Sequence, residues 1–178
     1  SAEYFGDYIM AGTLSVQKIQ GLASSATPTT VEIASGHVLH APGHVMQVVQ
    51  TIGTTSQSTT STSYVNYTPA NASITPSSTS SKILVQMECE VSTFDNGDDG
   101  RTGVAVYKDG SLLSNEKISR HYDNGGNGFQ LVNTITINHL DSPSTTSAIT
   151  YQLYFKKIAA FHHNTINNAS ITLMEIAG

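Results

Sequence analysis

Apolar side chains occupy every second position over residues 83–91, and the positions between them are polar apart from Leu84. Because consecutive side chains leave opposite faces of a pleated strand, this pattern predicts a β-strand with one buried face. The Ser/Thr/Pro-rich run before it, residues 75–81, predicts a loop that leads into the strand. The side chains predicted to be buried are Ile83, Val85, Met87, Cys89 and Val91.

The same period of two recurs along the chain, with turn-forming residues between the segments. Further strands are predicted over residues 45–52, 64–68, 129–137, 149–155 and 170–176, and one around Val104 and Val106. Asp109 and Gly110 predict a tight turn. No stretch shows sustained helical spacing, so no long helix is expected. About eight short antiparallel strands in a domain of ordinary size predict an all-β jelly-roll sandwich.

The first 44 residues differ from the remainder. Two short β-like segments, residues 14–20 and 30–39, are separated by a turn-rich run and carry too few apolar side chains to enclose a core. We therefore expect residues 1–44 to form an N-terminal β-rich stem that depends on contacts with other chains, and residues 45–178 to form the head domain. The stem residues expected to make interchain contacts are Leu14, Val16, Ile19, Val31 and Ile33.

Composition narrows the possible partners. Of the 178 residues only 12% are charged, the net charge is −5, and the eight Lys and Arg residues form no cluster larger than the pair Lys156 and Lys157. This distribution is not an electrostatic footprint for nucleic acid or for an anionic membrane. No apolar run reaches the roughly 20 residues that span a bilayer. Cys89 is the only cysteine, so no intrachain disulfide is possible, and its place in the alternating strand predicts a buried thiol.

Several short segments occur in a specific order between residues 15 and 176: SVQKIQG, TVEIASGHVLHAPGHVMQVVQ, SITPSSTSSKILV, VYKDGSLL, LDSPSTTSAITYQLYFK and SITLMEI. In these the chain resembles a group of bacteriophage virion proteins, especially of phages that infect cyanobacteria and other aquatic bacteria, commonly labelled tail fibre or structural proteins. Their order also resembles the trimeric jelly-roll head of complement-type and tumour-necrosis-factor-like proteins. The resemblance implies a homotrimer whose N-terminal segments attach it to other virion proteins.

We expect three loops of the head, residues 94–101, 121–128 and 161–168, to contact a host surface glycan or protein, because loops on a rigid sandwich vary without disturbing its core. The residues predicted to face this ligand are Asp95, Asn96, Asp98, Asp99, Arg101, His121, Tyr122, Asp123, Asn124, His162 and His163. Repetition of identical heads would raise the effective affinity of a weak single site.

Neither a metal nor a cofactor is predicted. The DNGDDG run at residues 95–100 departs from the helix-loop-helix calcium pattern, because Gly97 and Val106 stand at two of its ligand positions. Such a run is more typical of a solvated turn. His37, His40 and His44 lie near the boundary of stem and head, but their spacing provides no closed ligand set from one chain.

Catalysis is not expected either. The sequence has no Gly-x-Ser-x-Gly elbow, and its one cysteine is predicted to be buried. The favoured function is a non-enzymatic, homotrimeric fibre or spike component of a phage particle that mediates host attachment. A trimeric capsid decoration protein that stabilises the head shell is the first alternative, and a secreted carbohydrate-binding module is another.

Overall fold

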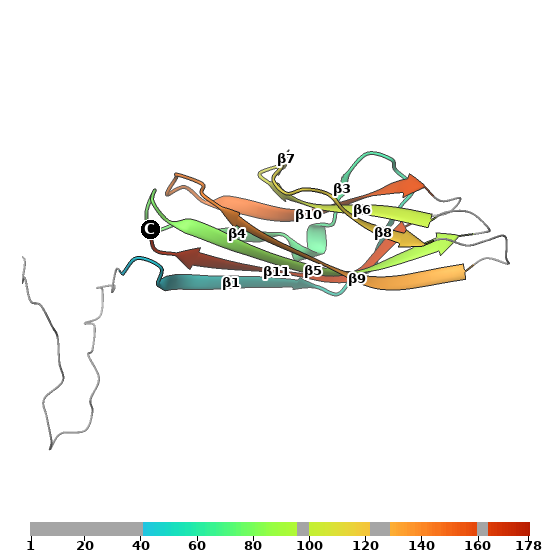
Figure 1. The fold of residues 1–178 in the computed structure, drawn as a ribbon, viewed down its shortest axis with the longest axis horizontal. Coiled ribbons are helices and arrows are strands. Elements are labelled where there is room, and N and C mark those ends of the chain that lie inside the picture. Colours follow the sequence, from blue (N-terminus) through green and yellow to red (C-terminus); the bar gives the residue numbers. More distant parts are fainter. Residues whose placement is uncertain (1–40, 96–99, 122–128, 160–163) are drawn as a thin grey trace, which may run out of the picture. The chain divides into compact units, whose positions relative to one another are not determined.

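The computed structural model describes residues 41–95, 100–121, 129–159 and 164–178, which form two antiparallel β-sheets packed face to face (Figure 1). Sheet A has the order β1-β11-β5-β9, with β2 beside β11. Its strands are β1 (Val45–Gly53), β2 (Gln57–Thr59), β5 (Lys82–Asp95), β9 (Phe129–Asp141) and β11 (Asn164–Ile176). The all-β sandwich predicted from the alternation is confirmed.

Sheet B has the order β3-β10-β6-β7, with β4 beside β10 and β8 beside β6. Its strands are β3 (Val65–Asn66), β4 (Ala72–Ile74), β6 (Gly100–Lys108), β7 (Ser111–Leu112), β8 (Lys117–His121) and β10 (Ile149–Ala159). A single 3₁₀ turn, η1 (Thr68–Ala70), leads into β4. Apart from the step through β6, β7 and β8, successive strands from β4 onward change sheet, which is the connectivity of a jelly roll.

The predicted buried face of β5 forms the centre of the core. The five apolar side chains of its alternating pattern are at most 1% exposed. They pack against the inward faces of β10 and β11, where Tyr151, Leu153, Phe155, Ile171 and Leu173 are also fully buried. Burial raises the pKa of the Cys89 thiol to about 12, so this cysteine is an unreactive apolar side chain at neutral pH.

The strands extend further than the alternation predicted. Residues 94–101 were expected to form a loop, but β5 continues to Asp95 and β6 begins at Gly100. Residue 121 belongs to β8, and residues 164–168 belong to β11 rather than to a loop. Polar side chains replace apolar ones on the inward face here: Thr93 and Thr102, both fully buried, pair their hydroxyl groups at 2.8 Å. Because threonine is also common in loops, the sequence does not distinguish this buried pair from loop residues, and the ends of β5 and β6 were therefore predicted as a loop.

Strand pairing defines two ends of the sandwich. At the end that we call proximal, Val45 at the start of β1 pairs with Ile176 near the C-terminus, and Ile176 pairs with Lys82 at the start of β5. At the opposite, distal end lie the strand ends that bound the β5–β6, β8–β9 and β10–β11 connections, as Figure 1 lets the reader follow from the labelled strands. The pairs at this end are Asp95–Phe129, Gly100–His121, Arg101–Ala159 and Thr93–Asn164.

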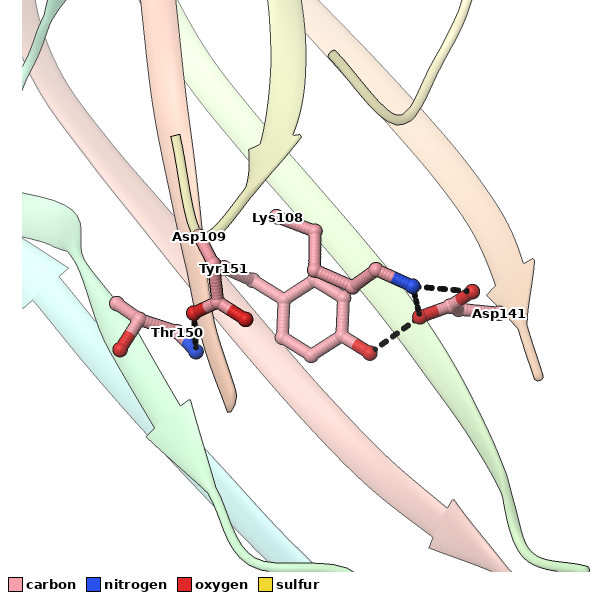
Figure 2. Close-up of polar contacts among 5 residues, drawn as sticks. All are labelled: Lys108, Asp109, Asp141, Thr150 and Tyr151. Atoms are coloured by element: carbon pink, nitrogen blue, oxygen red, sulfur yellow. Dashed lines mark hydrogen bonds and ion pairs between the residues drawn. The ribbon is translucent and has the colours of Figure 1, made fainter. Parts of the chain in front are cut away.

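A carboxylate joins the two sheets near the proximal end (Figure 2). Asp141, the last residue of β9 in sheet A, accepts a hydrogen bond of 2.8 Å from the Tyr151 hydroxyl and lies 3.0 Å from the Lys108 ammonium, both in sheet B. Burial, and then the hydrogen bond to Asp141, raise the pKa of Tyr151, so its hydroxyl group stays a donor at neutral pH. The neighbouring Asp109 makes a different contact, accepting the backbone N–H of Thr150 at the exposed β6–β7 turn.

A second carboxylate is buried on the core face of β11. Glu175 continues the inward row of Ile171 and Leu173 and is 0% exposed. It accepts hydrogen bonds of 2.7 and 2.6 Å from the Ser77 backbone N–H and hydroxyl, and one of 2.6 Å from the Gln47 amide. Burial alone would raise the pKa of Glu175, but these hydrogen bonds outweigh it and lower the pKa to about 2. Glu175 thereby fixes the loop before β5 to β1 and β11.

Candidate functional site

The structure brings the edges of the three predicted ligand-facing loops together at the distal end. Asp95 ends β5, Arg101 lies in β6, and His121 ends β8, so these three belong to strands and not to loops. Backbone pairing joins β5 to β9 and β11, and β6 to β8 and β10, at this end. Asn164 adds a side-chain contact there, because its amide donates to the backbone carbonyl of Arg101 at 2.9 Å.

The remaining predicted site residues cannot be compared with the structure. Those that lie outside the described residues are Asn96, Asp98, Asp99, Tyr122, Asp123, Asn124, His162 and His163, with the stem residues Leu14, Val16, Ile19, Val31 and Ile33. Within the described ranges, no group of three or more His, Cys, Asp or Glu side chains is placed to hold a metal ion. No helix in the described part of the chain has the length and apolar character needed to cross a membrane.

Three tyrosines gather on the outer face of sheet B. Tyr107 of β6 and Tyr154 of β10 stack with ring centroids 3.9 Å apart and planes at 19°, and Tyr64, just before β3, meets Tyr107 edge-on at 5.5 Å. All three rings are half-buried and keep part of their surface in solvent. Offset and edge-on contacts of this kind stabilise aromatic pairs beyond the area that they bury. The stack therefore holds the rings in fixed orientations on the surface.

A charged pair completes this group, which we call the tyrosine cluster: Tyr64, Tyr107, Tyr154, Glu116 and Lys156. The Lys156 ammonium lies 4.5 Å from the centre of the Tyr64 ring and 2.9 Å from the Glu116 carboxylate. Glu116 also accepts a hydrogen bond of 2.6 Å from the Tyr64 hydroxyl. Burial would raise the pKa of Glu116, but the hydrogen bonds from Tyr64 and Lys156 lower it, so the carboxylate is ionised at neutral pH.

Small residues on β6 make room for the cluster. Gly103 and Ala105 face outward between larger neighbours, since Gly103 pairs with Lys156 and Ala105 pairs with Tyr154. A Cβ atom at Gly103 would come within 2.3 Å of the Glu116 carboxylate, so any larger residue would displace that side chain. Ala105 is 0% exposed although it points out of the sandwich, because neighbouring side chains cover it. Glycine within a strand weakens the strand, and it often marks a close approach of other groups.

The outer face of sheet A carries a different feature, a continuous apolar row across four strands. Val48 of β1 pairs with Met174 of β11, Met174 pairs with Leu84 of β5, and Leu84 pairs with Leu140 of β9. Val48 is 57% and Leu140 50% exposed, whereas Met174 and Leu84 are half-buried. The next row toward the distal end is polar but uncharged and consists of Gln50, Thr172, Gln86 and Asn138.

Sequence reasoning missed both surfaces. The signal for the tyrosine cluster was available in residues 149–155, where Tyr151 falls on the core face and Tyr154 on the opposite face. An aromatic residue on the solvent face of a half-buried strand indicates a surface feature. The apolar row had no comparable signal, because Leu84 and Leu140 become neighbours only through the register of β5 and β9.

No family model and no curated protein matches the chain. Among solved structures, that of the infectious bursal disease virus Gx strain is 14% identical, with 84% of this chain and 36% of that chain covered and a TM-score of 0.43. The crystal structure of the T13 viral particle of infectious bursal disease virus is also 14% identical, with 84% of this chain and 35% of that chain covered and a TM-score of 0.44. An exo-beta-1,3-galactanase from Phanerochaete chrysosporium is 15% identical, with 80% of this chain and 30% of that chain covered and a TM-score of 0.21. The chain thus spans about a third of the length of each, and likeness at this level carries no conclusion about its function.

Proposed function

We propose that this chain is a non-enzymatic structural protein of a phage particle, a homotrimeric fibre- or spike-type component that attaches to the host surface. The resemblance of its ordered sequence segments to phage virion proteins supports this role. The jelly-roll sandwich is compatible with it, although a sandwich by itself hosts many functions. Other virion proteins would bind residues 1–44, and a host glycan or protein would bind the head.

The observation that carries the proposal is the separation of the two ends of the head. The chain enters the sandwich at Val45 in the proximal end, and the strand ends that bound the three predicted recognition loops lie at the distal end. An attachment protein needs this polarity, because the part fixed to the particle and the part that meets the host must not compete for the same surface. A decoration protein lying flat on a shell has no such need.

The apolar row on sheet A supports self-association. On the outward faces of its four long strands, the charged side chains are Lys82, Glu88 and Glu90, all on β5. Interface centres are depleted in charge, and exposed apolar patches on soluble proteins mark contact surfaces. We assign this row to contacts between copies of the chain in the homotrimer, where it would lose contact with water.

Sedimentation equilibrium of the full chain tests the homotrimer. We expect a mass of three chains at micromolar concentration, and Leu84→Glu to shift the population toward single chains because it places a carboxylate within the apolar row. Gln86→Glu is the matched control, since it adds the same charge two residues away on the same face, in the polar row, and should preserve the trimer. A wild-type chain that sediments alone would refute the homotrimer. If the Leu84→Glu variant is still trimeric, the apolar row is not the contact between the chains.

Host attachment is tested separately by adsorption. Purified full-length trimer, added in excess to host cells, should reduce subsequent adsorption of the phage because both compete for the same receptor. The control is the same quantity of heat-denatured protein. Undiminished phage adsorption in the presence of trimer that is folded by circular dichroism would contradict the attachment role.

A further inference from the structure

We propose that the tyrosine cluster on the outer face of sheet B binds an uncharged pyranose sugar. This inference deepens the proposed attachment role and rests on it, by naming the ligand class and a site on a sheet face rather than in the distal loops. Pyranose rings present a face of C–H groups and a rim of hydroxyl groups. A protein site for them therefore needs a fixed aromatic face with hydrogen-bonding groups beside it.

The aromatic face is supplied by Tyr154. One side of its ring is stacked on Tyr107 at 3.9 Å, and among the described residues no other ring or cation packs against it. We assign the opposite side of this half-buried ring to the sugar, as the next layer of the stack. Tyr64 is not equivalent, because its ring already lies under the Lys156 ammonium. The ring of Tyr154 is held before any ligand arrives, which lowers the entropy lost on binding.

Hydrogen-bonding groups surround this ring. Within the described part of the chain, neither the Tyr107 nor the Tyr154 hydroxyl makes a hydrogen bond to a protein group. Asn66 pairs directly with Tyr154 in the β3–β10 register, and its buried amide oxygen Oδ1 has no hydrogen-bond partner among the described residues. Buried polar atoms are normally satisfied, and a hydroxyl group of a bound sugar would supply a donor to this acceptor.

Charge in the cluster favours a neutral ligand. The single cation, Lys156, is neutralised by Glu116 at 2.9 Å, and Glu116 is held in turn by Tyr64. An anionic sugar would find no free positive charge in the cluster, and a cationic one would compete with Lys156 for the same carboxylate. A neutral sugar requires neither rearrangement. The space that Gly103 leaves for Glu116 keeps this arrangement intact.

Saturation-transfer difference NMR on the full-length protein tests the site. The probes are the methyl glycosides of glucose, galactose, mannose and N-acetylglucosamine, with methyl glucuronide as a charged probe, each at millimolar concentration. We expect saturation of the C–H protons of one pyranose face for at least one neutral probe, and about tenfold or greater loss of affinity in Tyr154→Ala. Tyr154→Leu, which keeps apolar bulk on the strand, should lose binding equally. Tyr154→Phe should retain the stacking contribution.

Val132→Ala is the control, because it shortens an exposed apolar side chain on sheet A, away from the cluster, and should leave binding unchanged. The inference is overturned if no neutral glycoside gives a signal, if folded Tyr154→Ala and Tyr154→Leu bind like wild type, or if the glucuronide binds more tightly than the neutral probes. These results would leave trimer formation and phage adsorption untouched. Failure of the attachment role would instead appear as undiminished adsorption with sugar binding intact.

Discussion

Near the proximal end of the sandwich two buried carboxylates cross-link the structure, whereas among the described residues of the distal end a hydroxyl pair and a side-chain amide join the two sheets. Asp141 links the sheets through Lys108 and Tyr151, and Glu175 fixes the loop before β5. Distally, Thr93 and Thr102 link the sheets through a hydroxyl pair, and Asn164 reaches the backbone of the opposite sheet. Each end thus has polar cross-links within the core. Those of Asp141 and Glu175 depend on ionised groups, whereas those of Thr93, Thr102 and Asn164 do not.

This difference indicates how the two ends respond to their surroundings. Charge-assisted hydrogen bonds are stronger than neutral ones, and breaking a buried one leaves an uncompensated group. The cross-links made by Asp141 and Glu175 are therefore the stronger kind at neutral pH. The hydroxyl pair of Thr93 and Thr102 and the hydrogen bond from the Asn164 amide are neutral and do not titrate.

The largest effect is expected for Glu175→Leu. The substitution removes a fully buried carboxylate, and with it the acceptor of the Ser77 N–H, of the Ser77 hydroxyl and of one hydrogen bond from the Gln47 amide. We expect a loss of about 4 kcal/mol in the free energy of unfolding, measured by urea denaturation. Met174→Leu, one residue away on the outer face of β11, is the matched control and should change stability little. Equal effects of the two variants would contradict the importance of the carboxylate.

Acid should weaken the proximal end next. The pKa of Glu175 is about 2 in the folded chain and 4.5 ordinarily, so its contribution to stability is complete above pH 4.5 and is lost as the pH falls toward 2. The full loss, reached below pH 2, is on the order of 3 kcal/mol, and about 2 kcal/mol of it is expected by pH 3. Urea denaturation at pH 6, 4 and 3 measures it. The Glu175→Gln variant should show a flatter dependence over this window, and a slope as steep as that of wild type would assign the acid sensitivity to other groups.

Asp141→Ala should cost about 2 kcal/mol, because it leaves the Tyr151 hydroxyl buried without an acceptor and removes the ion pair with partly exposed Lys108. Asp109→Asn is the control drawn beside it in Figure 2: it removes the charge of an exposed turn residue but tolerates the positive φ of 47° there, so it should cost less than half as much. Thermal unfolding of the two variants at pH 7 makes the comparison. Equal shifts in Tm would show that burial of Asp141 does not matter.

The smallest effect belongs to the distal end. Thr93→Val removes one hydroxyl and leaves that of Thr102 buried without a partner, for a loss of about 1 kcal/mol in urea denaturation at neutral pH. The double variant Thr93→Val/Thr102→Val should recover most of this loss, because an apolar pair of similar shape satisfies the site. Additive losses in the double variant would mean that the hydroxyl pair is not the interaction that matters.

The sequence predicted the middle of the sandwich better than its ends. The alternation of residues 82–91 identified the buried face of β5 residue by residue, because an apolar core enforces the period of two. At the ends the inward positions carry Thr93, Thr102, Asn164 and Glu175, whose side chains are polar yet buried. Periodicity assigns such residues to loops or to the solvent face, so β5 and β6 were predicted too short and the buried acid was not foreseen.

The candidate site was less accessible to prediction for a different reason. The tyrosine cluster draws Tyr64, Glu116 and Lys156 from three separate segments, and only the pairing of β10 with β3 and β6 brings them together. The gathering of the three loop edges at one end likewise follows from the order of strands in the two sheets. Single-sequence patterns define faces of strands, but they do not define which strands are neighbours.

Imaging of the intact particle tests most directly the claim that the two ends of the head serve different purposes. One Fab fragment would bind a peptide tag added after Gly178, beside Ile176 at the proximal end, and another a tag inserted within residues 122–128, between the distal ends of β8 and β9. The account predicts that the distal label lies farther from the particle in electron micrographs, with three labels on each projection. Both labels at the same height on the shell, in hundreds of copies, would contradict it.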